Sequence, residues 1–280
     1  MPVTAHLFFD LGTLNDVLDA FEQATVSWVF ILHPIALATF FTLATIELGW
    51  SLFRHVLAAA STLEGLFDLV IRKVVAFSFA YYVLYFSPAI IPLILSSFQR
   101  AGTAASGIDA LRPSTFLAAG CELAAGFMFQ ANLLGVLLDP FAMNVLLLTV
   151  FFTVALFGLM AAVILLTLIE SYLLIPCAVF LMPFSATRWT SPLTEGVLTH
   201  TFALGLRLFL LMLVSGILRT FVQTWAEQVH STDLLSPISY LAFCGQLACI
   251  TLVLWNVPRL ARALIRPTLS LHLTPKVGDN

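Results

Sequence analysis

The longest apolar run in the chain, residues 141–184, contains 44 residues and a single charged side chain, Glu170. As an α-helix it would be about 66 Å long, roughly twice the thickness of the hydrocarbon core of a bilayer. A helix that is apolar on every side lies either in the core of a large protein or in a membrane. The run therefore constrains the fold more than any other feature, and it points to lipid.

Composition favours the membrane. Of the 280 residues, 60% are hydrophobic and 10% are charged, against about 25% charged in an ordinary soluble domain. The mean hydropathy is +1.02. So few charged side chains could not cover the surface of a soluble fold. The net charge of −3 gives no indication of a strongly basic nucleic-acid-binding surface. We expect an all-α, polytopic helical membrane protein, with about five transmembrane helices plus interfacial amphipathic helices.

Four further apolar stretches are long enough to cross the bilayer. They cover approximately 27–50, 74–97, 201–220 and 238–257. The organisation expected from them is an outer-face amphipathic helix over 1–26, two spans over 27–97 with a cytoplasmic interfacial helix at 51–73, an outer (periplasmic) region over 98–140, a three-span core over 141–257 and a basic cytoplasmic tail over 258–280. Within the outer region, a Gly/Ala/Ser-rich loop is expected at 101–110, followed by a helix from Pro113 to about Leu138.

The distribution of charge decides whether the long run crosses once or twice. Basic residues favour the cytoplasmic side of a membrane. A single crossing places Arg188 and the tail residues Arg259, Arg262 and Arg266 inside, with the N-terminus and the acidic 221–235 segment outside. Arg100, Arg112 and Arg219 are the exceptions. We therefore expect five spans in an inner (cytoplasmic) membrane, with a periplasmic N-terminus and a cytoplasmic C-terminus.

No catalytic or nucleotide-binding motif is present, and no His/Cys spacing indicates a metal. We expect no catalytic residue, cofactor or metal site, and hence no enzyme. Charges inside spans are costly and informative. Glu47 lies near a span end and is interpreted as structural. Glu170 and Arg207 lie deeper; they form a contact in one interpretation and are separately solvated in the other.

Two prolines interrupt the end of the long run. Pro176 and Pro183 are expected to kink the helix, because proline lacks an N–H group and clashes with the preceding turn. Pro176 in particular removes the hydrogen-bond donor that the carbonyl of Tyr172 would otherwise have. Broken helices of this kind occur in transporters and in structural membrane proteins alike.

The segment from Ile169 to Leu213 resembles the TrbL family. The resemblance rests on a cluster at 169–172 (Ile-Glu-Ser-Tyr), on a stretch at 205–209 (Gly-Leu-Arg-Leu-Phe) and on a turn formed by Phe184, Thr187, Arg188, Trp189 and Thr190. It is good over 140–262. It departs from the family pattern at 181–186, where the usual glycine-rich loop is replaced, and in the near absence of a long hydrophilic tail.

The resemblance implies an inner-membrane platform or channel subunit of a type IV secretion (conjugation-type) machine. Such a subunit supports pilus assembly and the passage of protein or DNA–protein substrates. The implied partners are membrane lipids, further copies in a ring-like homo-oligomer, secretion ATPases, stalk and pilus subunits, and in passing the secreted substrate. The alternative from the residues alone is a small-solute transporter or channel that uses Glu170 and Arg207 as substrate charges.

Overall fold

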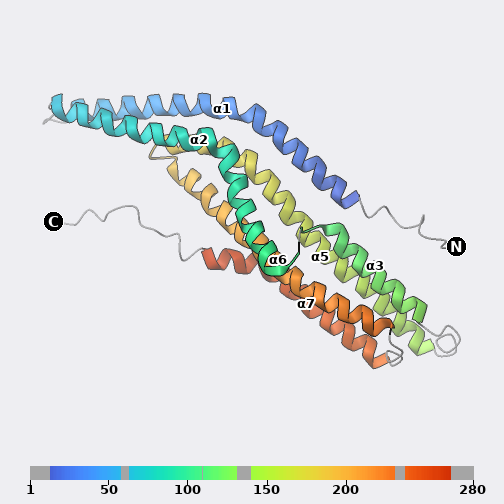
Figure 1. Cartoon of the computed structure of the whole chain (residues 1–280). Helices are drawn as coiled ribbons and strands as arrows, with labels where there is room; N and C mark the ends of the chain where they lie inside the picture. The colour runs from blue at the N-terminus through green and yellow to red at the C-terminus, as the bar shows by residue number, and fades with distance from the viewer. Residues whose placement is uncertain (1–12, 58–62, 109, 131–139, 231–236, 266–280) are drawn as a thin grey trace, which may run out of the picture. The chain divides into compact units, whose positions relative to one another are not determined.

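The computed structural model describes residues 13–57, 63–108, 110–130, 140–230 and 237–265, and all regular structure in these ranges is helical (Figure 1). The elements are α1 (Thr13–Leu57), α2 (Leu63–Ser106), α3 (Pro113–Gln130), α5 (Pro140–Leu181), the 3₁₀-helix η1 (Met182–Ala186), α6 (Ser191–His230) and α7 (Pro237–Ile265). Five helices are long and apolar enough to cross a membrane: α1, α2, α5 with its extension η1, α6 and α7. The predicted all-α, polytopic fold is confirmed.

The chain divides into two compact units, which are described separately. The hairpin unit comprises residues 21–97, 170–205 and 267–280, and the α3 unit comprises residues 1–20, 98–169 and 206–266. Helices α1, α2, α5 and α6 each contribute one part to each unit.

In the hairpin unit, α1 and α2 run antiparallel and side by side (Figure 1). Aromatic pairs join them at matched positions: His33 lies 5.8 Å from Tyr85 between ring centroids, and Phe40 lies 6.2 Å from Tyr81. The ends of the two helices, Leu57 and Leu63, are equally far from residue 60. Each pair is nearly symmetric about that residue, as expected for two antiparallel helices that lie next to each other in the sequence.

Helix ends differ from the sequence prediction in the first half of the chain. The helices expected at 1–26 and 51–73 are not separate elements: α1 runs from Thr13 through the first span to Leu57, and α2 runs from Leu63 through the second span. No proline lies where these segments join the spans. Pro34 of α1 lies inside the first span itself. A helix that has nucleated propagates through residues without a breaker. Residues 1–12 and 58–62 lie outside the described residues.

The loop predicted at 101–110 is wrong for its first six residues, because α2 continues to Ser106. Alanines favour the helix there, and Gly102 allows the side chain of Met212 to approach. The helix ends where Gly107 adopts a φ of +67° and donates its N–H to the carbonyl of Thr103 at 3.0 Å. A left-handed glycine is the usual way to end a helix.

Later boundaries also move. The helix predicted over 113–138 is described only to Gln130, and 131–139 lie outside the described residues. Helix α6 begins at Ser191, ten residues before the predicted span, because the polar stretch 191–200 is itself helical. Helix α7 extends to Ile265, so Arg259 and Arg262 are helical, whereas Arg266 lies outside the described residues.

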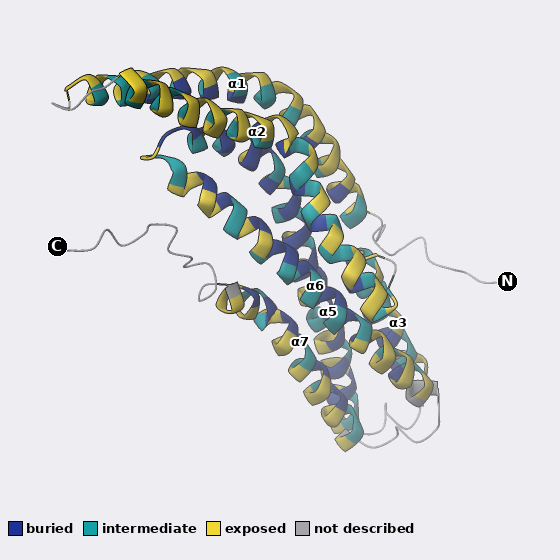
Figure 2. Ribbon diagram, turned by 60° about the vertical axis from the view of Figure 1, so that its left-hand side comes forward, coloured by how far each residue is buried: buried dark blue, intermediate teal, exposed yellow. Residues whose placement is uncertain are grey.

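Close helix approaches form the core of the α3 unit, which Figure 2 shows as buried faces. A Cβ atom on Gly120 would lie 2.5 Å from the Cβ of Phe157, and a Cβ on Gly216 would lie 2.9 Å from the backbone oxygen of Ser106. Phe127 packs edge-on against Phe243, with ring centroids 4.9 Å apart. Small residues at these positions let the helices approach closely.

Most of the long apolar run forms one helix, α5, and its single crossing of the membrane stays a prediction. Helix α5 continues for 42 residues with Pro176 inside it, and it ends at Leu181, two residues before Pro183. Pro183 therefore lies not inside α5 but in the first turn of η1, where a proline is tolerated because no N–H donor is needed there. The hydroxyls of Thr149, Thr153 and Thr167 each donate to the carbonyl four residues earlier. Their polarity is thereby hidden from lipid.

Candidate functional site: a charged cleft in the hairpin unit

A buried carboxylate lies near the end of the α1–α2 hairpin. The side chain of Glu47 is 4% exposed, and its Oε1 lies 2.5 Å from the Nζ of Lys73 on α2. Ser51, one turn further along α1, donates its hydroxyl to the same oxygen at 3.5 Å. Because a buried charge is tolerated only with a partner, the Glu47–Lys73 pair holds the two helices in register.

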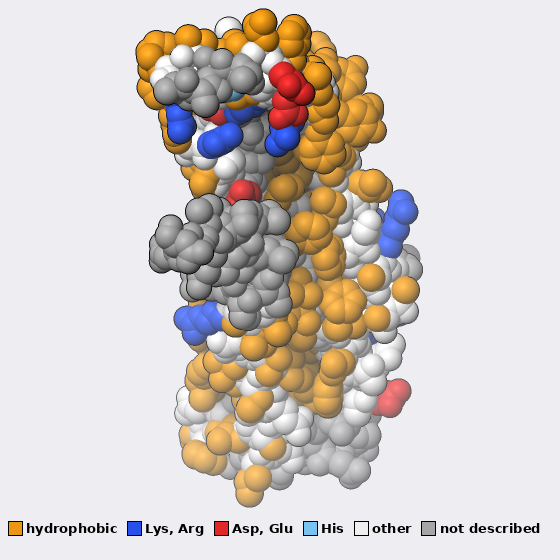
Figure 3. All heavy atoms as spheres, turned by 90° about the vertical axis from the view of Figure 1, so that its left-hand side faces the viewer, with side chains coloured by type: hydrophobic (Ala, Val, Ile, Leu, Met, Phe, Trp, Pro, Cys, Tyr) orange, Lys and Arg blue, Asp and Glu red, His pale blue; other side chains and the backbone are white. Residues whose placement is uncertain are grey.

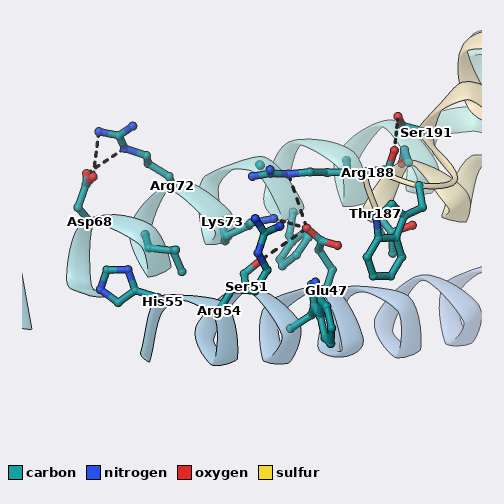
Figure 4. A pocket seen from close by; sticks show the side chains of 18 of the residues that line it. Glu47, Ser51, Arg54, His55, Asp68, Arg72, Lys73, Thr187, Arg188 and Ser191 are labelled. Atoms are coloured by element: carbon teal, nitrogen blue, oxygen red, sulfur yellow. Dashed lines mark hydrogen bonds and ion pairs between the residues drawn. The ribbon is translucent and has the colours of Figure 1, made fainter. Parts of the chain in front are cut away.

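The turn that follows α5 lies against this pair (Figure 4). The Nε of Arg188 is 3.9 Å from Oε1 of Glu47. Trp189 packs edge-on against Trp50 of α1, with ring centroids 6.0 Å apart. This segment, the 182–190 turn, is more than 130 residues from Glu47 in the sequence. It nevertheless contacts the hairpin through one ion pair and one aromatic pair.

Hydrogen bonds within the turn fix its shape. The hydroxyl of Thr190 donates to the carbonyl of Phe184, and the hydroxyls of Thr187 and Thr190 also bond to each other. The N–H of Ser191 donates to the carbonyl of Thr187 at 3.0 Å, where α6 begins. Thr187 is buried. A turn held in this way presents the exposed Arg188 and Trp189 on a fixed backbone.

The hairpin and the turn together line a cleft of about 810 Å³. Its walls carry four Lys/Arg side chains and two carboxylates, a difference of two positive charges, in a chain whose net charge is −3. These residues are Arg54, Arg72, Lys73, Arg188, Glu47 and Asp68. Arg72 pairs with Asp68 at 2.9 Å, and both are largely exposed. Figure 3 shows charged side chains gathered at this end of the hairpin unit, among hydrophobic ones.

The cleft suits the binding of an anionic group. It brings together cations, two tryptophans and hydroxyls. Among the residues that the structure describes, no three His, Cys, Asp or Glu side chains gather as a metal site would require.

A second set of contacts in the hairpin unit depends on Pro176. The sequence predicted that this proline leaves the carbonyl of Tyr172 without its helical donor. The single hydroxyl proton of Thr25 on α1 is shared between two carbonyl oxygens, that of Phe21 at 2.8 Å and that of Tyr172 at 3.2 Å. The phenol of Tyr172 donates to Glu22 at 3.3 Å. The backbone carbonyl and the phenol hydroxyl of Tyr172 therefore both contact α1.

The two charges inside spans have different surroundings. Oε1 of Glu170 lies 3.4 Å from Nε2 of His200 on α6. Arg207 lies further along α6, in the α3 unit, whereas Glu170 belongs to the hairpin unit. The contact between Glu170 and Arg207 stays a prediction. In α7, Arg262 donates to the carbonyl of Pro258 at 3.2 Å, and Arg259 to the side chain of Asn256 at 3.4 Å.

Sequence reasoning missed three partners: Lys73, Thr25 and His200. One signal could have found Lys73, because Glu47 and Lys73 are both 13 residues from residue 60, the midpoint between the two hairpin helices. In an antiparallel helical hairpin with a short turn, residues equally distant from the turn face each other. No comparable local signal connects Thr25 to Tyr172, since they are 147 residues apart.

Comparison with protein families places this geometry in context. The model of the family described as "TrbL/VirB6 plasmid conjugal transfer protein" matches residues 41–257. The chain belongs to the TrbL/VirB6 family. The matched residues include Glu47, Lys73, the 182–190 turn, Glu170 and Arg207, so the whole cleft lies inside the family region.

A relative in the curated proteins agrees with this assignment. The chain is 22% identical over 254 residues to a probable conjugal transfer protein TrbL from Sinorhizobium fredii (strain NBRC 101917 / NGR234). The alignment covers 90% of this chain and 63% of that protein. The chain thus spans less than two thirds of the length of its TrbL/VirB6 relative. With five helices able to span a bilayer, this family member is a multi-pass membrane protein.

Proposed function

We propose that the chain is a non-enzymatic platform or channel subunit in the inner membrane, belonging to a conjugation-type, type IV secretion machine. The observation that carries this proposal is the family match over residues 41–257, in a chain with five helices of spanning length. The subunit supports pilus assembly and the passage of protein or DNA–protein substrates. Energy comes from separate ATPases.

The orientation that we propose has the N-terminus in the periplasm and the C-terminus in the cytoplasm. The basic cleft supports it, because four of the twelve Lys/Arg residues of the chain line one cavity near the α1–α2 turn and the 182–190 turn. Under the positive-inside rule this end faces the cytoplasm. The 182–190 turn and the tail then meet cytoplasmic partners, and residues 98–140 meet stalk or pilus subunits.

A ring of several copies is part of the proposal. Helices α1 and α2 carry large exposed apolar side chains, among them Phe30 at 82% and Phe79 at 71%. Helix α5, with 42 residues, is about 63 Å long and exceeds the hydrocarbon thickness of about 30 Å. Neighbouring copies and partner subunits would cover apolar surface that lipid cannot reach.

The test is purification of the tagged full-length chain from native membranes that contain the whole machine. We expect several copies to elute together with secretion ATPases and stalk and pilus subunits. The variant Arg54→Glu, which reverses a charge in the cleft, should lower the recovery of the ATPases and leave the stalk subunits bound. Arg100→Glu, on the opposite side in this topology, is the matched control.

Recovery of the chain alone, together with solute flux when it is reconstituted by itself into liposomes, would reject the proposal. That result would favour a small-solute transporter in which Glu170 and Arg207 contact the substrate.

A further inference from the structure

Two arginines that break the positive-inside pattern line one cavity in the α3 unit. The cavity has a volume of about 500 Å³, and Arg112, just before α3, and Arg219, on α6, both contribute to its wall. Both side chains are exposed. None of the described residues lining this cavity is acidic; Asp109 lies outside the described residues. Two cations thus share a cavity on the periplasmic side in the proposed topology, where the positive-inside rule expects few basic residues.

A buried hydroxyl in the same wall has no partner. Ser215 is 1% exposed, and its Oγ has no hydrogen-bond partner. It precedes Arg219 by one helical turn, so both side chains lie on the same face of α6. A buried polar group without a partner is costly, and such groups in native proteins often indicate a missing water, ion or ligand. An anionic oxygen bound by the arginines would accept this hydrogen bond.

The rest of the cavity is suited to an amphiphile. Phe116, Phe157 and Leu218 provide apolar wall, and Thr115 lies in the first turn of α3. The N-terminus of an 18-residue helix adds partial positive charge. Cavities of this size, mostly apolar with a few polar groups that converge, are typical of small-molecule sites.

We infer that this cavity binds the phosphate headgroup of an anionic phospholipid, with its chains along the apolar surface of α6. Arginine binds phosphate through two parallel N–H donors. Ile217 and Phe221 flank Arg219 in the sequence and are 59% and 44% exposed, on a helix that is able to span the bilayer. These neighbours favour a lipid over a soluble phosphate. The site is independent of the secretion role proposed above.

The test is native mass spectrometry of the full-length chain, titrated with short-chain phosphatidylglycerol or phosphatidylcholine in detergent. We expect the wild type to prefer phosphatidylglycerol at least about tenfold, since two arginines are involved and each 1.4 kcal/mol is tenfold. The double variant Arg112→Gln, Arg219→Gln should reduce the preference to about twofold or less. The matched control, Arg259→Gln with Arg262→Gln, removes the same amount of charge from α7. This variant should keep the wild-type preference for phosphatidylglycerol.

Three results would overturn the inference: no preference in the wild type, an equal loss in the control, or equally tight binding of glycerol phosphate, which would indicate a soluble ligand. If the double variant does not fold, Ala119→Glu places a carboxylate in the cavity wall without removing an arginine. It should abolish the preference, because an internal anion competes with the headgroup, and a retained preference would contradict the site. Ser215→Ala should weaken phosphatidylglycerol binding, because the phosphate then loses one hydrogen-bond donor.

Discussion

The carboxylate of Glu47 is deeply buried and depends on Lys73. Replacing Lys73 by Met should destabilise the protein by about 3 kcal/mol, because the change leaves the buried carboxylate with only the longer contacts to Arg188 and Ser51. Reversible unfolding in mixed detergent micelles measures the loss. The double variant Glu47→Gln, Lys73→Met should recover a large part of it, since the uncompensated charge is then gone.

Arg72→Met is the matched control, one residue away on the same helix. Arg72 and Asp68 form an exposed pair, with side chains 79% and 56% accessible. Exposed pairs contribute little, so the loss should be below about 1 kcal/mol. Equal effects of the two single changes would contradict a special role for the buried pair.

Thr25 and Pro176 should be energetically coupled. Thr25→Val removes the donor that the carbonyls of Phe21 and Tyr172 share and should cost about 1 kcal/mol, the net contribution of a typical hydrogen bond. In a Pro176→Ala background, residue 176 regains an N–H that can bond to the same carbonyl. The cost of Thr25→Val should then fall below about 0.5 kcal/mol. A double-mutant cycle measures the coupling, and additive effects would show that the threonine does not replace the lost donor.

The thiol of Cys121 in α3 should react slowly with alkylating reagents. Its burial, and secondarily the negative charge of Glu122, raise the pKa of this thiol above its ordinary value. Only the thiolate reacts, so the rate against pH should rise at higher pH in the folded chain than in denaturant. The measurement uses a chain with the other three cysteines replaced by alanine. Glu122→Gln should shift the curve part of the way back, and an unshifted folded curve would contradict the burial.

At the level of the helices, Gly216 controls how closely α6 approaches α2 in the α3 unit. A Cβ there would lie 2.9 Å from a backbone oxygen, which cannot move aside as a flexible side chain can. Gly216→Val should therefore destabilise the fold by about 1–3 kcal/mol, as overpacking does. In the same helix, Gly196 has open space around its Cβ position. Gly196→Ala should be neutral or stabilising by up to about 1 kcal/mol, and a similar loss in both variants would argue against the close approach.

The sequence was sufficient for the helical class and for the number of spanning helices, but not for the helix ends. Apolar runs and sparse charges identify spans because lipid imposes a single requirement, that the backbone satisfies its own hydrogen bonds. Helix ends depend on nucleation and packing, and for this reason the Ala-rich 101–106 segment was mistaken for a loop. In the site, Glu47, Arg188 and Trp189 were identifiable as unusual residues. The contact between Glu47 and the 182–190 turn could not be predicted, because contacts between distant segments have no local signal in the sequence.

For the whole molecule, topology is the prediction that most depends on α5 crossing once. Reporter fusions at Ser185 and Ser231 test it. The fusion at Ser185 should be active with a cytoplasmic reporter, and the fusion at Ser231 with a periplasmic one, since the acidic 221–235 segment lies outside in this topology. A cytoplasmic signal at Ser231 would contradict five spans with the N-terminus outside, and with it the orientation of the charged cleft.

The pairing of Glu47 with Lys73 also has a consequence for synthesis. Both residues belong to the first two helices, which a ribosome completes long before the 182–190 turn. The α1–α2 hairpin can therefore neutralise its own buried charge in the bilayer before the later helices are synthesised. In the most apolar stretch of α1, 11% of the residues are buried, against 44% in that of α5, so lipid suffices as the early neighbour of the hairpin. Arg188 is synthesised later, when the Glu47–Lys73 pair has already fixed the register of α1 against α2.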